Sequence, residues 1–168
     1  LAMLAYQKGD LNAAENYLNK AKSLKSDAGE VNANLALIEL NKGNVSAAET
    51  YMGKASGANG FNEAMGCLNI AKGSYQQAAS AVNGVKSNSA ALAQILNKDY
   101  AAAKSTLNGV QNSDAYTSYL KAVVAARTND AAGVNSNLKD AVSKDASLKA
   151  RAAKDLEFAS FKSVVESL

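Results

Sequence analysis

The sequence predicts an all-α fold made of repeated helix pairs, and three observations support this prediction. The chain of 168 residues contains no proline, so no residue type forbids continued helix. Hydrophobic residues make up 48% but aromatic ones only 6%, and much of the apolar share is alanine, the strongest helix former. Two similar stretches also recur with their turn glycines, Gly9 and Gly43, 34 residues apart. Turns must then come from Gly, Asn, Asp and Ser.

The first two copies, residues 1–21 and 35–55, share one pattern around the turn glycine. A small residue lies seven positions before it, a capping residue follows it, and apolar residues lie five, nine and twelve positions after it. The matching residues are Ala2, Asp10, Ala14, Leu18 and Ala21 in the first copy, and Ala36, Asn44, Ala48, Met52 and Ala55 in the second. We expect the glycine to end one helix with φ > 0, the Asp or Asn to cap the next helix, and the small residue to lie where the two helices cross.

Three weaker copies follow. Their turns align at Gly73, Lys98 and Asn129, and asparagine tolerates the left-handed conformation better than most residues. The turn-to-turn spacings are 34, 30, 25 and 31 residues, so the fourth pair is the shortest, chiefly in its first helix at 89–97. The small residue before the turn is Gly66 in the third copy. The apolar positions after the turn are Ala78, Val82 and Val85 in the third copy, Ala103, Leu107 and Val110 in the fourth, and Val134, Leu138 and Ala141 in the fifth.

These residues resemble tetratricopeptide repeats, whose period is 34 residues. The usual tryptophan is replaced by Asn32 and Asn62, and the closing proline is absent. The resemblance implies a right-handed α-α superhelix of about five pairs with a concave and a convex face. It implies a single domain over 1–168, with repeats at 1–28 (partial), 29–58, 59–86, 87–112 and 113–146, then a cap at 147–168.

The two ends of the chain carry separate expectations. Apolar residues from Leu148 to Val165 predict a capping helix over 147–159 with a short turn or helix after it, because a repeat array exposes its last stacking face. A helix that docks on a partner is the alternative. The first repeat begins only eight residues before Gly9, so we expect the sequence to be a piece of a longer protein with more repeats upstream.

Composition and motifs give no sign of an enzyme, a metal or a cofactor. The chain has no histidine, and Cys67 is its one cysteine, so the commonest metal ligands and general base are missing. Ser118 and Lys121 match an S-x-x-K pattern without its companion motifs, which we interpret as chance. The net charge of +3 is small and dispersed, so nucleic acid is not an expected partner. No apolar run approaches the ~20 residues of a membrane span.

The sequence therefore predicts a scaffold that binds a peptide or protein, and the family resemblance implies that the first helices of the pairs line the binding face. The candidate residues are Gln7, Leu37, Asn41, Glu63, Cys67, Tyr116, Tyr119 and Arg127. Tyrosine and arginine are enriched at interface hot spots, although Tyr119 could instead pack between helices and Cys67 could be a small core residue. The alternative function is a structural spacer in a larger protein, since the composition is loosely similar to tetratricopeptide regions of bacterial cell-envelope proteins.

Overall fold

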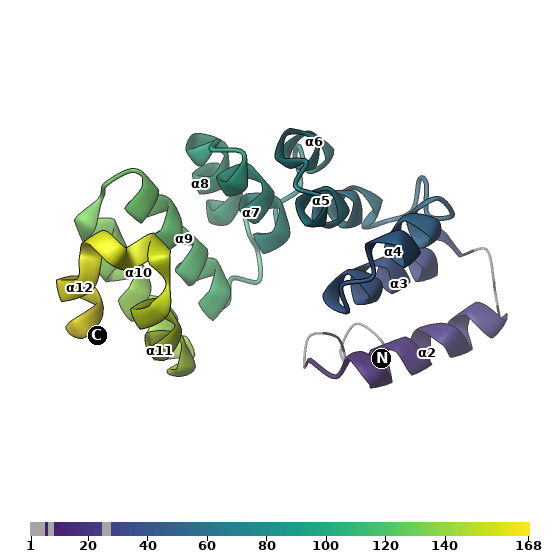
Figure 1. The fold of residues 1–168 in the computed structure, drawn as a ribbon, viewed down its shortest axis with the longest axis horizontal. Coiled ribbons are helices and arrows are strands. Elements are labelled where there is room, and N and C mark those ends of the chain that lie inside the picture. Colours follow the sequence, from purple (N-terminus) through teal and green to yellow (C-terminus); the bar gives the residue numbers. More distant parts are fainter. Residues whose placement is uncertain (1–5, 7–8, 25–27) are drawn as a thin grey trace. The chain divides into compact units, whose positions relative to one another are not determined.

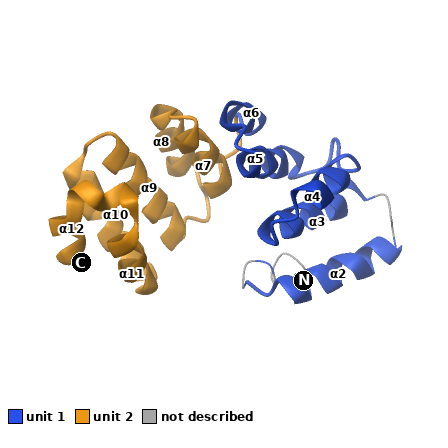
Figure 2. Ribbon diagram, viewed as in Figure 1, with its two compact units in different colours: residues 1–83 blue, residues 84–168 orange. Residues whose placement is uncertain are grey.

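The computed structural model describes residues 6, 9–24 and 28–168, and this part of the chain is all-helical, with no strand. Eleven α-helices and one 3-10 helix follow one another in the described residues and pack against their neighbours, which is compatible with a helical repeat (Figure 1). They form two compact units, residues 1–83 and 84–168 (Figure 2). The division falls close to the predicted boundary between the third and fourth repeats.

Unit 1 contains the described helices of the first three predicted repeats. Each first helix packs against the second helix that follows it, α3 on α4 and α5 on α6, and the two first helices α3 and α5 also contact each other. The bounds are α2 Leu11–Leu24, α3 Gly29–Asn41, α4 Val45–Met52, α5 Phe61–Ala71 and α6 Tyr75–Ala81.

Unit 2 holds the fourth and fifth pairs and the C-terminal segment. The pairs are α7 with α8 and α9 with α10, and α9 also contacts both helices of the fourth pair. The first helix of the fourth pair is short, as the turn spacing predicts. The bounds are α7 Asn88–Leu96, α8 Tyr100–Asn108, α9 Ala115–Arg127, α10 Ala131–Lys144, α11 Ser147–Lys154, η1 Leu156–Phe161 and α12 Lys162–Glu166.

All five predicted turn residues adopt the left-handed conformation. The φ angles are 77° at Gly9, 81° at Gly43 and 73° at Gly73, and the two non-glycine turn residues, Lys98 and Asn129, have φ of 64° and 57°. They are the only non-glycine residues with positive φ in the described chain. The alignment that placed a lysine and an asparagine in register with glycine is therefore confirmed by the backbone.

The four turns whose flanks are described have the same hydrogen bonds. The backbone N–H of the residue after the left-handed position donates to the carbonyl five residues earlier, at 2.8 Å in each of the four turns. The left-handed residue itself donates to the carbonyl three residues earlier. This arrangement is the Schellman motif, which satisfies carbonyls that a helix end would leave unpaired. The repeat is thus a repeat of backbone geometry as well as of residue types.

The residue after each turn begins the next helix, but only the aspartates cap it with a side chain. The carboxylates of Asp10, Asp99 and Asp130 accept from backbone N–H groups three residues later, at 3.0, 3.4 and 2.9 Å. Asn44 lies at the N-cap of α4 without such a bond, and its Nδ2 donates to Glu39 Oε2 at 2.8 Å. The expectation that the Asn44 side chain caps α4 is therefore wrong.

The core follows two of the three predicted apolar positions, because the position twelve after the turn is buried at Ala55 and Ala141 but only half-buried at Ala21, Val85 and Val110. The residues five and nine after each turn are all buried, from Ala14 and Leu18 in the first pair to Val134 and Leu138 in the fifth. At the predicted crossing in the third pair, a Cβ added to Gly66 would lie 2.4 Å from Val82 Cγ1. A side chain at this position would have to displace Val82, so glycine permits the close approach of α5 and α6.

Candidate functional site

The first candidate site is a surface of unit 1 formed by successive first helices. We call it the first-helix face of unit 1 and define it as Tyr6, Leu37, Asn41, Glu63 and Cys67. Leu37 and Asn41 are four residues apart on α3, and Glu63 and Cys67 are four apart on α5, so each pair lies on one side of its helix. Because α3 and α5 pack together, the two pairs belong to neighbouring helices of one unit.

A hydrogen bond on this face joins α3 to Tyr6 of the first pair. Asn41 Nδ2 donates to Tyr6 Oη at 2.7 Å, which joins the first pair to the second. The pKa of Tyr6 is raised, mainly because the phenol is partly buried. The hydrogen bond from Asn41 opposes this, while the charges of Cys67 and Glu63 raise the pKa further. The direct contact on this face is thus the hydrogen bond between Asn41 and Tyr6, and the neighbouring helix α5 carries Glu63 and Cys67.

The face combines apolar and polar groups that remain partly accessible. Asn41 is exposed, whereas Tyr6, Leu37, Glu63 and Cys67 are half-buried. A phenol, an amide and a carboxylate can accept and donate hydrogen bonds to a peptide, and half-buried leucine supplies apolar contact. Gln7, the remaining candidate of this unit, lies outside the described residues. The described candidates of the first three repeats thus lie on α3 and α5, two helices of unit 1 that contact each other.

The candidates of unit 2 have a different environment, because the C-terminal segment covers them. The Tyr119 side chain is only 1% exposed, and its hydroxyl donates to Asp155 Oδ2 at 2.6 Å. Phe158 packs edge-on against the Tyr119 ring, with the centroids 5.5 Å apart. Burial and the hydrogen bond to Asp155 together raise the pKa of Tyr119 strongly. Tyr119 is therefore a core residue, in agreement with the alternative prediction that it packs between helices.

Tyr116 and Arg127 also contact the C-terminal segment. Arg127 forms a two-pronged ion pair with Glu157, in which Nε donates to Oε2 at 2.9 Å. The hydrogen bonds that Arg127 donates to Glu157 raise the pKa of this guanidinium above its ordinary value. Tyr116 stacks on Tyr119, and the Arg151 guanidinium lies 5.4 and 4.9 Å from their ring centroids. In this arrangement the three side chains hold the C-terminal segment.

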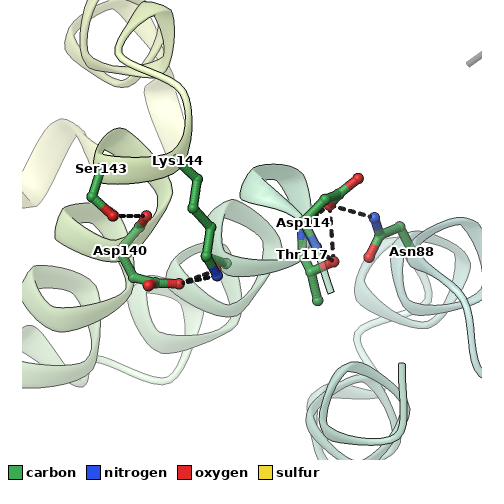
Figure 3. Close-up of polar contacts among 7 residues, drawn as sticks. Asn88, Asp114, Thr117, Asp140, Ser143 and Lys144 are labelled. Carbon is green, nitrogen blue, oxygen red and sulfur yellow. Dashed lines mark hydrogen bonds and ion pairs between the residues drawn. The ribbon is translucent and has the colours of Figure 1, made fainter. Parts of the chain in front are cut away.

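Two polar clusters in unit 2 join helices (Figure 3). In the first, Asp114 Oδ1 accepts from Asn88 Nδ2 at 3.1 Å and from the backbone N–H of Thr117 at 2.8 Å, which links α7 to the start of α9. Burial opposes ionisation of Asp114, but the hydrogen bonds from Thr117, Asn88 and the backbone outweigh it and lower its pKa.

The second cluster contains Ser118 of the S-x-x-K match. The Ser118 hydroxyl donates to Asp140, and the nearby amine is Lys144, whose Nζ lies 3.3 Å from Ser118 Oγ and 2.7 Å from Asp140 Oδ2. The hydrogen bond from Lys144, followed by that from Ser118, lowers the pKa of Asp140. Ser118 thus contacts Asp140 and Lys144, two residues of α10 that are not part of the S-x-x-K match. The cluster holds α10 against α9.

Sequence reasoning predicted one capping helix over 147–159, which is wrong, because α11 ends at Lys154, Asp155 is extended and a 3-10 helix follows. It also missed the groups that hold the C-terminal segment. The signal was present in the run Asp155–Ala159, where two carboxylates flank an apolar residue and an aromatic follows. It also missed an open surface cavity of about 230 Å³ between α8, α9 and α10, which Lys104, Lys121 and Asn108 line in part. Neither feature follows from the repeat pattern, because each depends on how consecutive pairs pack.

Comparison with family models, with curated proteins and with solved structures gave no match for this chain. Among the described residues, no group of three His, Cys, Asp or Glu side chains is placed to hold a metal ion. No described helix is long and apolar enough to cross a membrane.

Proposed function

We propose that this chain is a tetratricopeptide-like scaffold that binds a peptide or protein partner on the first-helix face of unit 1. The observation that carries the proposal is the hydrogen bond from Asn41 of α3 to Tyr6 of the first pair, beside the neighbouring helix α5 that carries Glu63 and Cys67. Partly accessible tyrosine and amide groups beside apolar surface are typical of protein interfaces. The five left-handed turns and the shared Schellman geometry support the repeat interpretation on which the proposal depends.

The right-handed superhelix is the finer part of the proposal. In that architecture the first helices of consecutive pairs would line one continuous concave surface. The contact between α3 and α5 within unit 1 is the arrangement that such a surface requires.

The proposal is tested by affinity capture from a lysate of the source organism with matched variants. The test variant carries Asn41→Lys and Glu63→Lys on the first-helix face. The control carries Asn16→Lys and Glu49→Lys, the same changes at exposed positions of the second helices α2 and α4. The second change also removes the surface ion pair between Glu49 and Lys72, whose atoms are 2.6 Å apart. Circular dichroism first establishes that both variants fold.

A partner that the unaltered chain and the control capture, but the test variant loses, supports binding on the first-helix face. Equal capture by both variants would place the binding surface elsewhere. Absence of a specific partner for every form would favour the structural spacer. One observation already favours a structural role for unit 2, because its own C-terminal segment covers Tyr119 and Arg127.

A further inference from the structure

The covered surface of unit 2 has the features of an occupied peptide site. We call it the α9 face and define it as Tyr116, Tyr119, Val123 and Arg127, which lie at helical spacing on one side of α9. Its occupant is the docked segment, residues 155–158. Tyr119 and Arg127 are eight residues apart and therefore about 12 Å apart along the helix, so the docked segment is held at two separate points.

Each point of attachment selects a chemical group. The Tyr119 hydroxyl donates to the carboxylate of Asp155, and the Arg127 guanidinium pairs with the carboxylate of Glu157 through two hydrogen bonds. The Phe158 ring is 1% exposed and packs edge-on against Tyr119. Between the carboxylates, Leu156 is 88% exposed and contributes little to docking. The face therefore selects a four-residue pattern. Its first and third residues are acidic, its second can be any residue, and its fourth is aromatic.

Part of the attachment of the docked segment is open to water. It belongs to a 3-10 helix, whose hydrogen-bond geometry is poorer than that of an α-helix. The side chains of the Arg127–Glu157 ion pair remain 27% and 28% exposed, so water and salt reach both charges. Phe158 adds apolar attachment, because it is buried in one cluster with Tyr119, Leu148, Ala152 and Val165, so a competing peptide must supply these apolar groups as well as the two carboxylates.

We propose that the α9 face is a docking site for an acidic–aromatic segment of a partner protein, and that the chain's own residues 155–158 occupy it until such a segment displaces them. This deepens the proposed function by naming the chemistry of a second partner-binding surface. The tethered segment competes at high effective concentration, so the unaltered chain binds such a peptide weakly. The apparent affinity for the peptide equals the intrinsic affinity of the open face multiplied by the fraction of molecules in which the face is open.

The test uses the full chain and a labelled peptide with the sequence of residues 147–168. Glu157→Arg in the chain places two like charges together and opens the face, so this variant is expected to bind the peptide at least about tenfold more tightly than the unaltered chain. Glu166→Arg is the control, because it makes the same charge change at an exposed residue of α12. The control is expected to bind like the unaltered chain.

Exchanging the charges of Arg127 and Glu157 tests whether the peptide binds through the ion pair that the structure shows. A chain with Arg127→Glu is expected to reject the native peptide and to bind a peptide carrying Glu157→Arg. If both peptides bind both open chains equally, the α9 face does not select the carboxylate and the proposal is overturned. Self-association of the unaltered chain that depends on residues 155–158, with no effect of added peptide, would assign the face to a second copy and also overturn it.

Hydrogen exchange of the unaltered chain gives a readout that needs no folded variant. Excess native peptide is expected to raise exchange in residues 155–166 while α10 stays protected. Unchanged exchange at saturating peptide would overturn the proposal. This experiment is independent of the capture experiment on the first-helix face. Asn41→Lys and Glu63→Lys lie in unit 1 and are expected to leave peptide binding to the α9 face unchanged.

Discussion

Lys98 provides a quantitative test of the repeat geometry, because it occupies a turn position that other pairs give to glycine. Its φ of 64° lies in the left-handed region, which costs a residue with a side chain roughly 1–2 kcal/mol. Glycine avoids this cost but loses about 0.5–1 kcal/mol more backbone entropy on folding. We therefore expect Lys98→Gly to raise the free energy of unfolding of unit 2 by about 0.5–1 kcal/mol.

The assay is urea denaturation followed by far-UV circular dichroism, with hydrogen exchange of α7 and α8 to assign the change to unit 2. Lys104→Gly is the matched control, because the same substitution inside α8 is expected to lower stability by about 1 kcal/mol. The two substitutions should thus have opposite signs. If Lys98→Gly destabilises the chain as much as Lys104→Gly, residue 98 is not left-handed in solution and the aligned turn is incorrect.

Three further predictions follow from contacts in the two units. Gly66→Ala is expected to lower the unfolding free energy of unit 1 by about 1 kcal/mol in urea denaturation, because the new Cβ clashes with Val82. Tyr119→Phe removes the donor to Asp155 and is expected to cost unit 2 about 1.5–3 kcal/mol in the same assay. The lowered pKa of Asp114 stabilises unit 2 above pH 3.8, and this stabilisation is lost as pH falls through the folded-state pKa, so Asp114→Asn is expected to flatten the loss of stability in acid.

Each of these has an outcome that would contradict it. Full additivity of Gly66→Ala with Val82→Ala would show that the two side chains do not meet. A change below about 0.5 kcal/mol for Tyr119→Phe would mean that the hydroxyl is solvated instead of bonded to Asp155. An unaltered acid profile for Asp114→Asn would show that other carboxylates govern unfolding.

The repeat pattern predicted the pairs, turns and buried positions because each depends on residues close in sequence. Lys98 and Asn129 were found by register alone, since neither residue type signals a turn as glycine does. The Asn44 side chain departed from the expected cap because Glu39, five residues earlier, accepts its amide N–H. Asn32 is buried at the place of the usual tryptophan, where its Nδ2 donates to the Ala28 carbonyl at 3.2 Å.

The sequence predicted the surroundings of the candidate residues better in unit 1 than in unit 2. The spacing of Leu37, Asn41, Glu63 and Cys67 indicates one face only if consecutive pairs stack, and the resemblance supplied that assumption. In unit 2 the same rule selected Tyr119 and Arg127 correctly as first-helix residues. It could not show that a segment about 30 residues later covers them, because contacts between distant segments leave no periodic signal.

The central claim is that the first-helix face of unit 1 contacts a partner, and site-specific photo-cross-linking tests it most directly. A photoreactive residue replaces Glu63 on α5 in one variant and Glu49 on α4 in another, and both are irradiated in lysate. The account predicts a discrete cross-linked partner from position 63 and none from position 49. The same partner from position 49 alone, or equal yield from both, would contradict it.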